Sequence, residues 1–178
     1  MTRVPEHIFR EYDIRGLADE ELTDETVVAV GASYGTYLSD SGVSSAIVAG
    51  DVRLSTPRIK SAIIEGLTSS GISVTDIGMT ATPVFYWSLH LFGVDGGVMV
   101  TGSHNPPEFN GLKLARGKTT IWGGEIREIY GIIAEERTKK PAGRGTVKNE
   151  NISALYIEML VSKIKLGPRK LKVVVDSG

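Results

Sequence analysis

The chain has 178 residues, 41% of them hydrophobic, and a formal net charge of −1 at pH 7. This length and composition allow one globular domain, or one domain with part of a second, and supply enough apolar residues for a core. The near-neutral charge excludes a general attraction to nucleic acid or anionic membranes, and the lack of cysteine excludes disulfides and thiolate metal sites.

The sequence contains no sign of a membrane or export segment. No stretch is apolar for long enough to span a bilayer. The first ten residues lack the apolar centre of a signal peptide. We therefore expect a cytoplasmic protein with no nucleic-acid and no membrane partner.

The first hundred residues alternate between helical and strand patterns. Residues 8–16 have little periodicity and predict a polar N-terminal loop. A helix is expected over 23–38, because Thr23 can cap it and acidic residues occupy its first turn. Apolar runs then predict strands over 45–49, 72–77 and 97–100, separated by helices that begin at Thr56-Pro57 and Thr82-Pro83.

The second part of the chain continues this pattern less regularly. Residues 112–115 and 119–122 predict two short strands, and 124–137 a helix with an isoleucine stripe. The composition of 138–148 is typical of a linker. A further helix over 151–165 and an apolar strand over 171–175 look like the opening of a βαβ unit that is cut short. The alternation indicates an α/β fold with a central sheet.

One loop concentrates the chemistry, in the stretch VTGSHNPPEFNGLKL over 100–114. It follows a buried strand, two prolines stiffen it, and Asn110-Gly111 is a strong turn signal before the next strand. Ser103, His104, Asn105 and Lys113 are thereby placed beyond a strand end, where open α/β sheets bind ligands.

Other catalytic motifs fail on their context. The stretch over 31–35 matches the G-x-S-x-G elbow of hydrolases, but it lies inside a capped helical run, so we interpret Ser33 as a helix residue. Residues 117–119 lack the spacing and the following helix of a P-loop. A hydrolase that uses Ser103 and His104 is also disfavoured, because adjacent side chains cannot readily be aimed at each other.

Three segments resemble one family. TGSHNP followed by NGLK closely resembles the phosphoserine loop of the α-D-phosphohexomutases, the phosphomannomutase/phosphoglucomutase family, and so do FREYDIRG over 9–16 and GDVRLS over 50–55. The resemblance implies a three-layer α/β/α domain with a mixed, mostly parallel sheet over residues 1–148. Residues 149–178 would hold the truncated start of a second α/β domain. Family members carry four domains, so domains II–IV would be missing partners.

The resemblance also implies a reaction. Ser103 would carry a phosphoryl group that moves between the 1- and 6-positions of a hexose phosphate through a hexose 1,6-bisphosphate. Lys113 and Arg15 would supply positive charge and acid/base catalysis, and His104 would donate to the transferring oxygens. Mg²⁺ would contact the Ser103 phosphate, with its other ligands on aspartates beyond Gly178. The chain alone is therefore expected to be inactive.

The substrate contacts follow from the same resemblance. They are expected from Tyr12, Arg15, Asn105 and Lys113. For Asp51 and Arg53 two interpretations stay open, a salt bridge within a turn and, as the resemblance implies, support of the neighbouring loops. The loop TGSHNPP is closer to mannose and glucose mutases than to glucosamine-phosphate mutases, whose loop reads SASHNP. Phosphoglucosamine mutase and a non-catalytic phosphosugar-binding module remain the alternatives.

Overall fold

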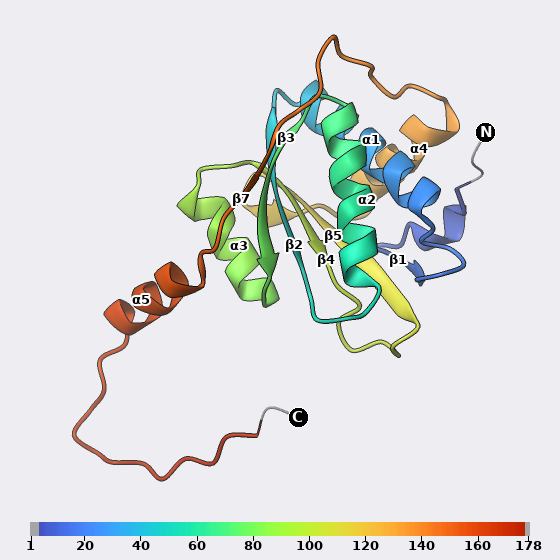
Figure 1. Ribbon diagram of the computed structural model, residues 1–178. Coiled ribbons are helices and arrows are strands. Elements are labelled where there is room, and N and C mark those ends of the chain that lie inside the picture. The colour runs from blue at the N-terminus through green and yellow to red at the C-terminus, as the bar shows by residue number, and fades with distance from the viewer. Residues whose placement is uncertain (1–3, 177–178) are drawn as a thin grey trace.

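The computed structural model describes residues 4–176 and has a seven-stranded sheet at its centre (Figure 1). The strands are β1 (Ile14–Leu17), β2 (Ser45–Gly50), β3 (Ser73–Met79), β4 (Gly96–Val100), β5 (Phe109–Arg116), β6 (Thr119–Thr120) and β7 (Val147–Asn149). Their order is β1-β5-β4-β2-β3-β7, with β6 paired to β5. Every antiparallel pair of strands in the sheet includes β5, which pairs with β1, β4 and β6. The other six strands therefore all run in one direction, opposite to β5. The predicted mixed, mostly parallel sheet is confirmed.

Helices cover both faces of this sheet. A 3₁₀ turn, η1 (Glu6–Ile8), comes before the sheet. The helices are α1 (Asp24–Asp40), α2 (Thr56–Ser69), α3 (Thr82–Leu91), α4 (Gly124–Ala134) and α5 (Ser153–Lys163). One core lies between the sheet and α1, α2 and α4; a smaller one lies under α3, against which α5 packs. This arrangement confirms the expected three layers.

The two cores follow from the alternation of side chains along each strand. Leu112 and Leu114 of β5 belong to the core under α1 and α2. Lys113, which lies between them, therefore points to the α3 side. By the same alternation Ile14 of β1 faces the larger core, so its neighbours Asp13 and Arg15 share the face of Lys113. The sheet thus gathers three charged side chains on one face.

Helix α1 agrees with its prediction. The Thr23 side chain accepts a hydrogen bond from the Thr26 amide at 3.3 Å and caps the helix. Ser33 lies inside α1, as predicted, and it is fully buried, so an external substrate cannot reach its hydroxyl. A Cβ on Gly66 of α2 would lie 2.3 Å from the Val28 carbonyl oxygen, so the glycines let α1 and α2 cross closely.

Two predicted loops in the first 116 residues contain strands. The expected turn at Asn110-Gly111 is wrong, because both residues lie inside β5. Asn110 is buried, and its side-chain amide donates to Ser55 Oγ at 2.9 Å and Thr56 Oγ1 at 3.0 Å, which replaces the turn's local bonds. The predicted N-terminal loop over 8–16 is likewise wrong at its end, since β1 begins at Ile14 and pairs with β5.

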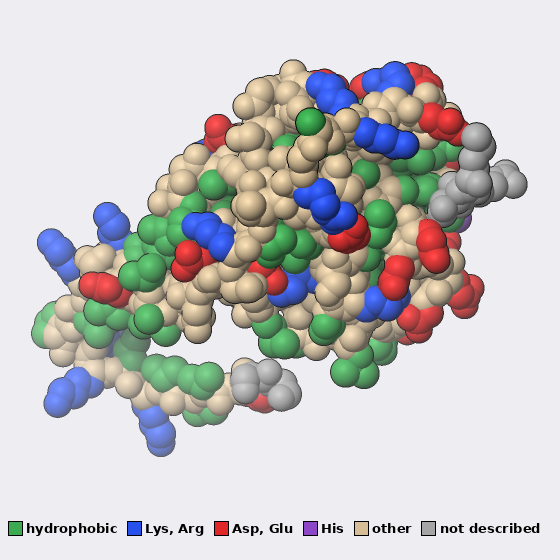
Figure 2. Space-filling model, turned by 45° about the horizontal axis from the view of Figure 1, so that its top comes forward, with side chains coloured by type: hydrophobic (Ala, Val, Ile, Leu, Met, Phe, Trp, Pro, Cys, Tyr) green, Lys and Arg blue, Asp and Glu red, His purple; other side chains and the backbone are tan. Residues whose placement is uncertain are grey.

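The last part of the chain differs from its prediction. The supposed linker ends in β7, which pairs with β3 at the edge of the sheet and crosses the proposed boundary between 148 and 149. That boundary stays a prediction. The expected strand over 171–175 is not formed, because no strand within residues 4–176 lies beside it to supply hydrogen bonds. Exposed apolar side chains gather on α5 and this segment (Figure 2). Within the same residues, no helix combines the length and apolar character needed to cross a bilayer.

Candidate functional site

The site lies where the order of the parallel strands reverses. From β2 the chain passes through α2 to β3 on one side, and then through α3 on the opposite face to β4 on the other side. Ligands of open α/β sheets bind outside the carboxyl ends of the strands at such a reversal. Asp51 and Arg53 follow β2 there, and the loop over 101–108 follows β4. The Asp51 amide donates to the Val100 carbonyl at 2.9 Å and joins the two strand ends.

The guanidinium of Arg53 holds the loop after β4. It donates to four backbone carbonyl oxygens: Nη1 to Pro106 at 2.6 Å and Phe109 at 2.9 Å, and Nη2 to Ser103 at 3.2 Å and Asn105 at 2.5 Å. Its side chain is only 14% exposed. The structure therefore bears out loop support over an isolated turn salt bridge, although Arg53 Nε does lie 3.5 Å from Asp51 Oδ2.

Asp51 and Gly102 complete this arrangement. The Asp51 carboxylate accepts hydrogen bonds from Thr56 Oγ1 at 2.6 Å and from the amides of Arg53 and Gly102 at 3.1 Å each. A Cβ on Gly102 would lie 2.2 Å from Arg53 Nε. Only glycine therefore leaves room for the guanidinium at this position.

Ser103 stands at the tip of the loop in a left-handed conformation. Its φ is 54°, which costs a residue other than glycine about 1–2 kcal/mol. Its side chain is exposed, and its amide donates to Thr101 Oγ1 at 3.0 Å. The exposed hydroxyl therefore stands on a strained backbone within a fixed loop, a combination that is typical of functional sites.

His104 contacts the Ser103 hydroxyl. Its Nδ1 lies 3.2 Å from Ser103 Oγ, so the expectation that adjacent side chains cannot be aimed at each other is wrong. The left-handed backbone at Ser103 changes the direction in which its side chain leaves the chain, which allows the contact. Among residues 4–176 no carboxylate bonds to His104, so the hydrolase alternative still lacks its third member.

A second group of charges lies on β5 and at the start of β1. Arg15 Nη2 donates to Asp13 Oδ2 at 2.5 Å, and Lys113 Nζ lies 3.8 Å from the same oxygen. Asp13 is 8% exposed. Two cations around one carboxylate leave a net charge of +1, which favours an anion. Gly111 pairs with Arg15 across the strands and presents no side chain beside it.

Arg15 has an unused donor. Its Nε is buried and has no hydrogen-bond partner among the described residues. A buried donor of this kind is costly unless a ligand or water accepts from it. No described residue accepts from this donor, so its hydrogen-bonding capacity is left unmet in the fold.

The predicted site residues therefore fall into two groups. Ser103, His104 and Asn105 share the loop, and the Asn105 amide nitrogen donates to the Gly102 carbonyl at 2.9 Å. Arg15 and Lys113 share Asp13. The backbone joins the groups, because the Thr101 amide donates to the Gly111 carbonyl at 2.9 Å. Tyr12, 66% exposed, precedes this cluster. Sequence reasoning missed Asp13, whose signal is its place two residues before Arg15 on the same strand face.

The described residues contain no ready-made metal centre. Within 4–176, no three histidine or carboxylate side chains lie close enough together to hold an ion. Any metal at the loop would need oxygen ligands from a group carried by Ser103 and from elsewhere.

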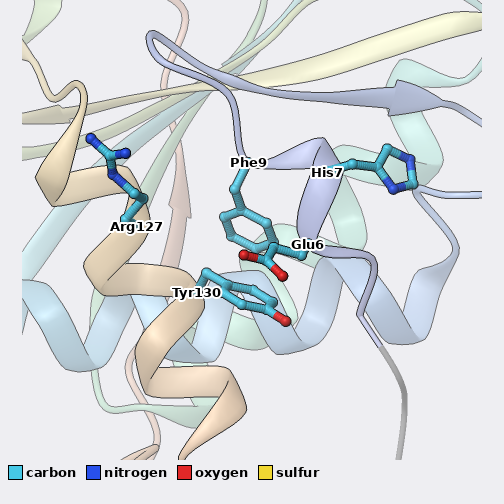
Figure 3. Close-up of a pocket in the computed structure, with 5 residues that line it drawn as sticks. All are labelled: Glu6, His7, Phe9, Arg127 and Tyr130. Atoms are coloured by element: carbon cyan, nitrogen blue, oxygen red, sulfur yellow. The ribbon is translucent and has the colours of Figure 1, made fainter.

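A cavity of about 540 Å³ lies away from this loop, between η1 and α4 (Figure 3). Glu6, His7, Phe9, Arg127 and Tyr130 line it. The rings of Phe9 and Tyr130 are 5.1 Å apart at their centroids and pack against each other. None of the predicted site residues reaches it, so the strand-end loop remains the candidate site.

Comparisons with known proteins identify the family of the chain. Residues 6–140 match the family model described as phosphoglucomutase/phosphomannomutase, alpha/beta/alpha domain I. The chain is 35% identical over 178 residues to a phosphoglucomutase of Neisseria meningitidis serogroup B and 37% identical over 176 residues to a phosphomannomutase of Escherichia coli. These alignments cover 100% and 96% of this chain, and the chain spans 38% of each relative.

A solved structure is similar as well. The crystal structure of a phosphoglucomutase/phosphomannomutase family protein from Burkholderia thailandensis superposes with a TM-score of 0.86 at 35% identity. The superposition covers 92% of this chain and 37% of that one.

Proposed function

The chain belongs to the phosphoglucomutase/phosphomannomutase family, and from that premise we propose that it supplies the phosphoserine of a hexose phosphomutase. The reaction is the reversible transfer of a phosphoryl group between the 1- and 6-positions of a hexose phosphate. The observation that carries the proposal is Ser103, whose hydroxyl is exposed at the tip of a loop fixed from below by Arg53.

The transfer takes place in two half-reactions, each of which moves one phosphoryl group and exchanges one proton at each oxygen involved. In the first, a free hydroxyl of the sugar phosphate bonds to phosphorus while the bond to Ser103 Oγ breaks, which yields a hexose 1,6-bisphosphate. The sugar hydroxyl loses its proton to a base, and Ser103 Oγ gains one. In the second, the other phosphoryl group returns to Ser103 by the reverse exchange. Positioning and charge stabilisation dominate such steps.

The charged residues have separate parts in this scheme. Lys113 and Arg15 attract the phosphate oxygens, and one or both exchange the sugar proton. The planar guanidinium of Arg15 presents a fork of donors suited to phosphate oxygens. His104, in contact with Ser103 Oγ, donates to the transferring group. Tyr12 and Asn105 contact the substrate at the edge of the loop.

Mg²⁺ fits the loop only through Ser103. Mg²⁺ prefers oxygen ligands, and the Ser103 phosphate would supply one of them. The remaining ligands would be aspartates beyond Gly178, as the resemblance implies. The ion would neutralise charge on the transferring phosphoryl group.

A module that binds phosphosugars without turnover is the second candidate. The two cations around Asp13 could hold a phosphate group without any turnover. A coupled assay of the complete gene product separates the two. Turnover of mannose or glucose phosphates supports the mutase, turnover of glucosamine phosphate alone supports the phosphoglucosamine alternative, and no turnover with any of them supports the binder.

The direct test is the covalent state of Ser103. We expect intact-protein mass spectrometry to find one added phosphoryl group after incubation with glucose 1,6-bisphosphate, and Ser103→Ala to abolish it. Ser33→Ala is the matched control, because Ser33 is buried in α1 and should leave the uptake unchanged. Normal mutase activity in the complete Ser103→Ala protein would refute the proposal.

A further inference from the structure

Arg53 forms an unusually complete set of contacts for a side chain that touches no catalytic side chain of the site. Its two terminal nitrogens bind four carbonyl oxygens on the loop. Two of these, Ser103 and Asn105, lie on the rising side of the loop, and Pro106 and Phe109 lie on the returning side. The guanidinium therefore spans the loop and fixes its two sides relative to each other. A lysine could not do this, because its ammonium is a single point without the planar fork of donors.

The loop is also built around this guanidinium. The three atoms nearest to a Cβ placed on Gly102 are all guanidinium atoms of Arg53, at 2.2, 2.3 and 2.8 Å. A side chain at position 102 would therefore collide with the Arg53 guanidinium. Asp51 holds both partners, since it accepts from the Gly102 amide at 3.1 Å and lies 3.5 Å from Arg53 Nε.

The residue after Gly102 is the strained one. Ser103 has a φ of 54°, and its carbonyl accepts from Arg53 Nη2 at 3.2 Å. A side chain other than glycine keeps this conformation only where its surroundings determine it. Arg53 donates to the Ser103 carbonyl and to the Asn105 carbonyl two residues later. It therefore fixes the backbone that follows the Cα of Ser103.

We propose that Arg53 is the positioning residue that holds Ser103 in its left-handed conformation and so sets the rate of phosphoryl transfer without binding the substrate. The inference rests on the proposed function, because it assigns Arg53 a part in that reaction. It also requires that Gly102 and Arg53 act as one unit.

The first test measures the loop itself in the complete gene product. Arg53→Ala should make the amides of 102–105, 108 and 109 exchange at least about tenfold faster, because hydrogen bonds to a charged donor are lost. Arg58→Ala is the matched control: Arg58 also donates to backbone carbonyls, at 2.6 Å to Ala18 and 2.9 Å to Leu22, but away from the loop. Its exchange should change near 18–24 and not at 102–109. Unchanged loop exchange in Arg53→Ala would overturn the proposal.

The second test separates positioning from substrate binding. Arg53→Ala and Arg53→Lys should each lower kcat by up to about 100-fold, as displacement of a reacting group does, with little change in KM. Arg58→Ala should keep kcat near that of the parent. A raised KM with an unchanged kcat would contradict the inference, and so would restoration of kcat by Arg53→Lys.

The third test measures coupling between the two residues. Gly102→Ala should lower kcat strongly in the parent protein, because its Cβ displaces the guanidinium. In the Arg53→Ala background the same substitution should have a much smaller effect. If the losses in kcat are additive, Gly102 and Arg53 act independently, and the proposal that they act as one unit is rejected.

These readouts distinguish failure of the inference from failure of the proposed function. If the parent protein shows neither turnover nor phosphoserine, the proposed function fails and the catalytic part of the inference fails with it. The exchange rates still decide whether Arg53 holds the loop in that case. If the parent protein turns over substrate and the Arg53 variants match Arg58→Ala in kcat and in loop exchange, the proposed function stands and the inference about Arg53 is wrong.

Discussion

At the scale of single residues, the site depends on side chains that hold others in place. Ser103 owes its conformation to neighbours that bond its amide and its carbonyl. Arg15 and Lys113 owe their common position to Asp13, which lies between them. A carboxylate shared by two cations in a partly buried place offsets their repulsion and their desolvation. The geometry of the candidate site therefore depends on these supporting side chains.

Asp13→Asn should be strongly destabilising. It leaves Arg15 and Lys113 with their charges but without the shared carboxylate, and both Asp13 and Arg15 have side chains only 11% exposed. We expect the free energy of unfolding to fall by about 3 kcal/mol, measured by urea titration. The control is Asp95→Asn, which breaks the more exposed pair with Lys118 and should cost less than about 1 kcal/mol. Equal losses would show that the cluster on β1 and β5 is not special.

Glu21 should account for part of the stability that the fold loses at acid pH. The Leu17 amide donates to its carboxylate at 2.6 Å, and this bond and His7 lower the pKa of Glu21 below its ordinary value of 4.5. A carboxyl group with a lowered folded pKa stabilises the fold above 4.5, and this contribution is lost as the pH falls through the lower value. Glu21→Gln should therefore narrow the difference in urea midpoint between neutral and acid pH. An unchanged difference would contradict this role.

At the scale of elements, helix packing is set by glycines rather than by large side chains. Helices α1 and α2 cross where Gly31 faces Gly66, and a Cβ on Gly31 would lie 2.7 Å from the Ile63 carbonyl oxygen. Backbone atoms cannot move aside as a flexible side chain can. The crossing therefore fixes the position of α2 against α1, and Thr56 in the first turn of α2 bonds to Asp51.

Gly66→Ala tests this crossing. Its Cβ would meet only backbone atoms of α1 within 2.8 Å, so the helices must separate, at a cost of about 1–3 kcal/mol. Gly131→Ala in α4 is the matched control, because its nearest neighbour is the flexible end of Arg137 at 3.9 Å. There, alanine should stabilise the helix by up to about 1 kcal/mol. Thermal unfolding that shifts in the same direction for both variants would reject the argument.

At the scale of the whole molecule, the sheet and the C-terminal part differ in how they are held. The strands β2, β3 and β4 are buried in the middle of the sheet. Helix α5 has no buried residue, and residues 164–175 form neither helix nor strand. Stability should therefore fall steeply from the sheet toward the C-terminal side (Figure 1).

Hydrogen exchange measures this gradient. We expect the amides of β2 and β4 to exchange only through global unfolding, whereas those of 164–175 should exchange almost as fast as in an unstructured peptide. The chain alone should show this contrast clearly. Strong protection over 164–175 in the isolated chain would mean that this segment is held by contacts other than those described.

Some of the fold and site could be predicted because the deciding physics is local. The alternation of capped helices and apolar strands specified the α/β layering. The positions of Gly102, Ser103 and the two prolines indicated a stiff loop beyond a strand. In contrast, Asn110-Gly111 forms part of β5, because a buried amide bonds to residues more than fifty positions away. No local pattern contains that information.

The sequence by itself therefore indicated the α/β layering, the family that the loop resembles and the side chains proposed to carry its chemistry. Only the tertiary structure decided what holds them: the four carbonyls bound by Arg53, the need for glycine at 102, and Asp13 between two cations. The physical reason is range. Helix caps and strand alternation act over a few neighbouring residues, whereas these supports join segments that meet only after the sheet has formed.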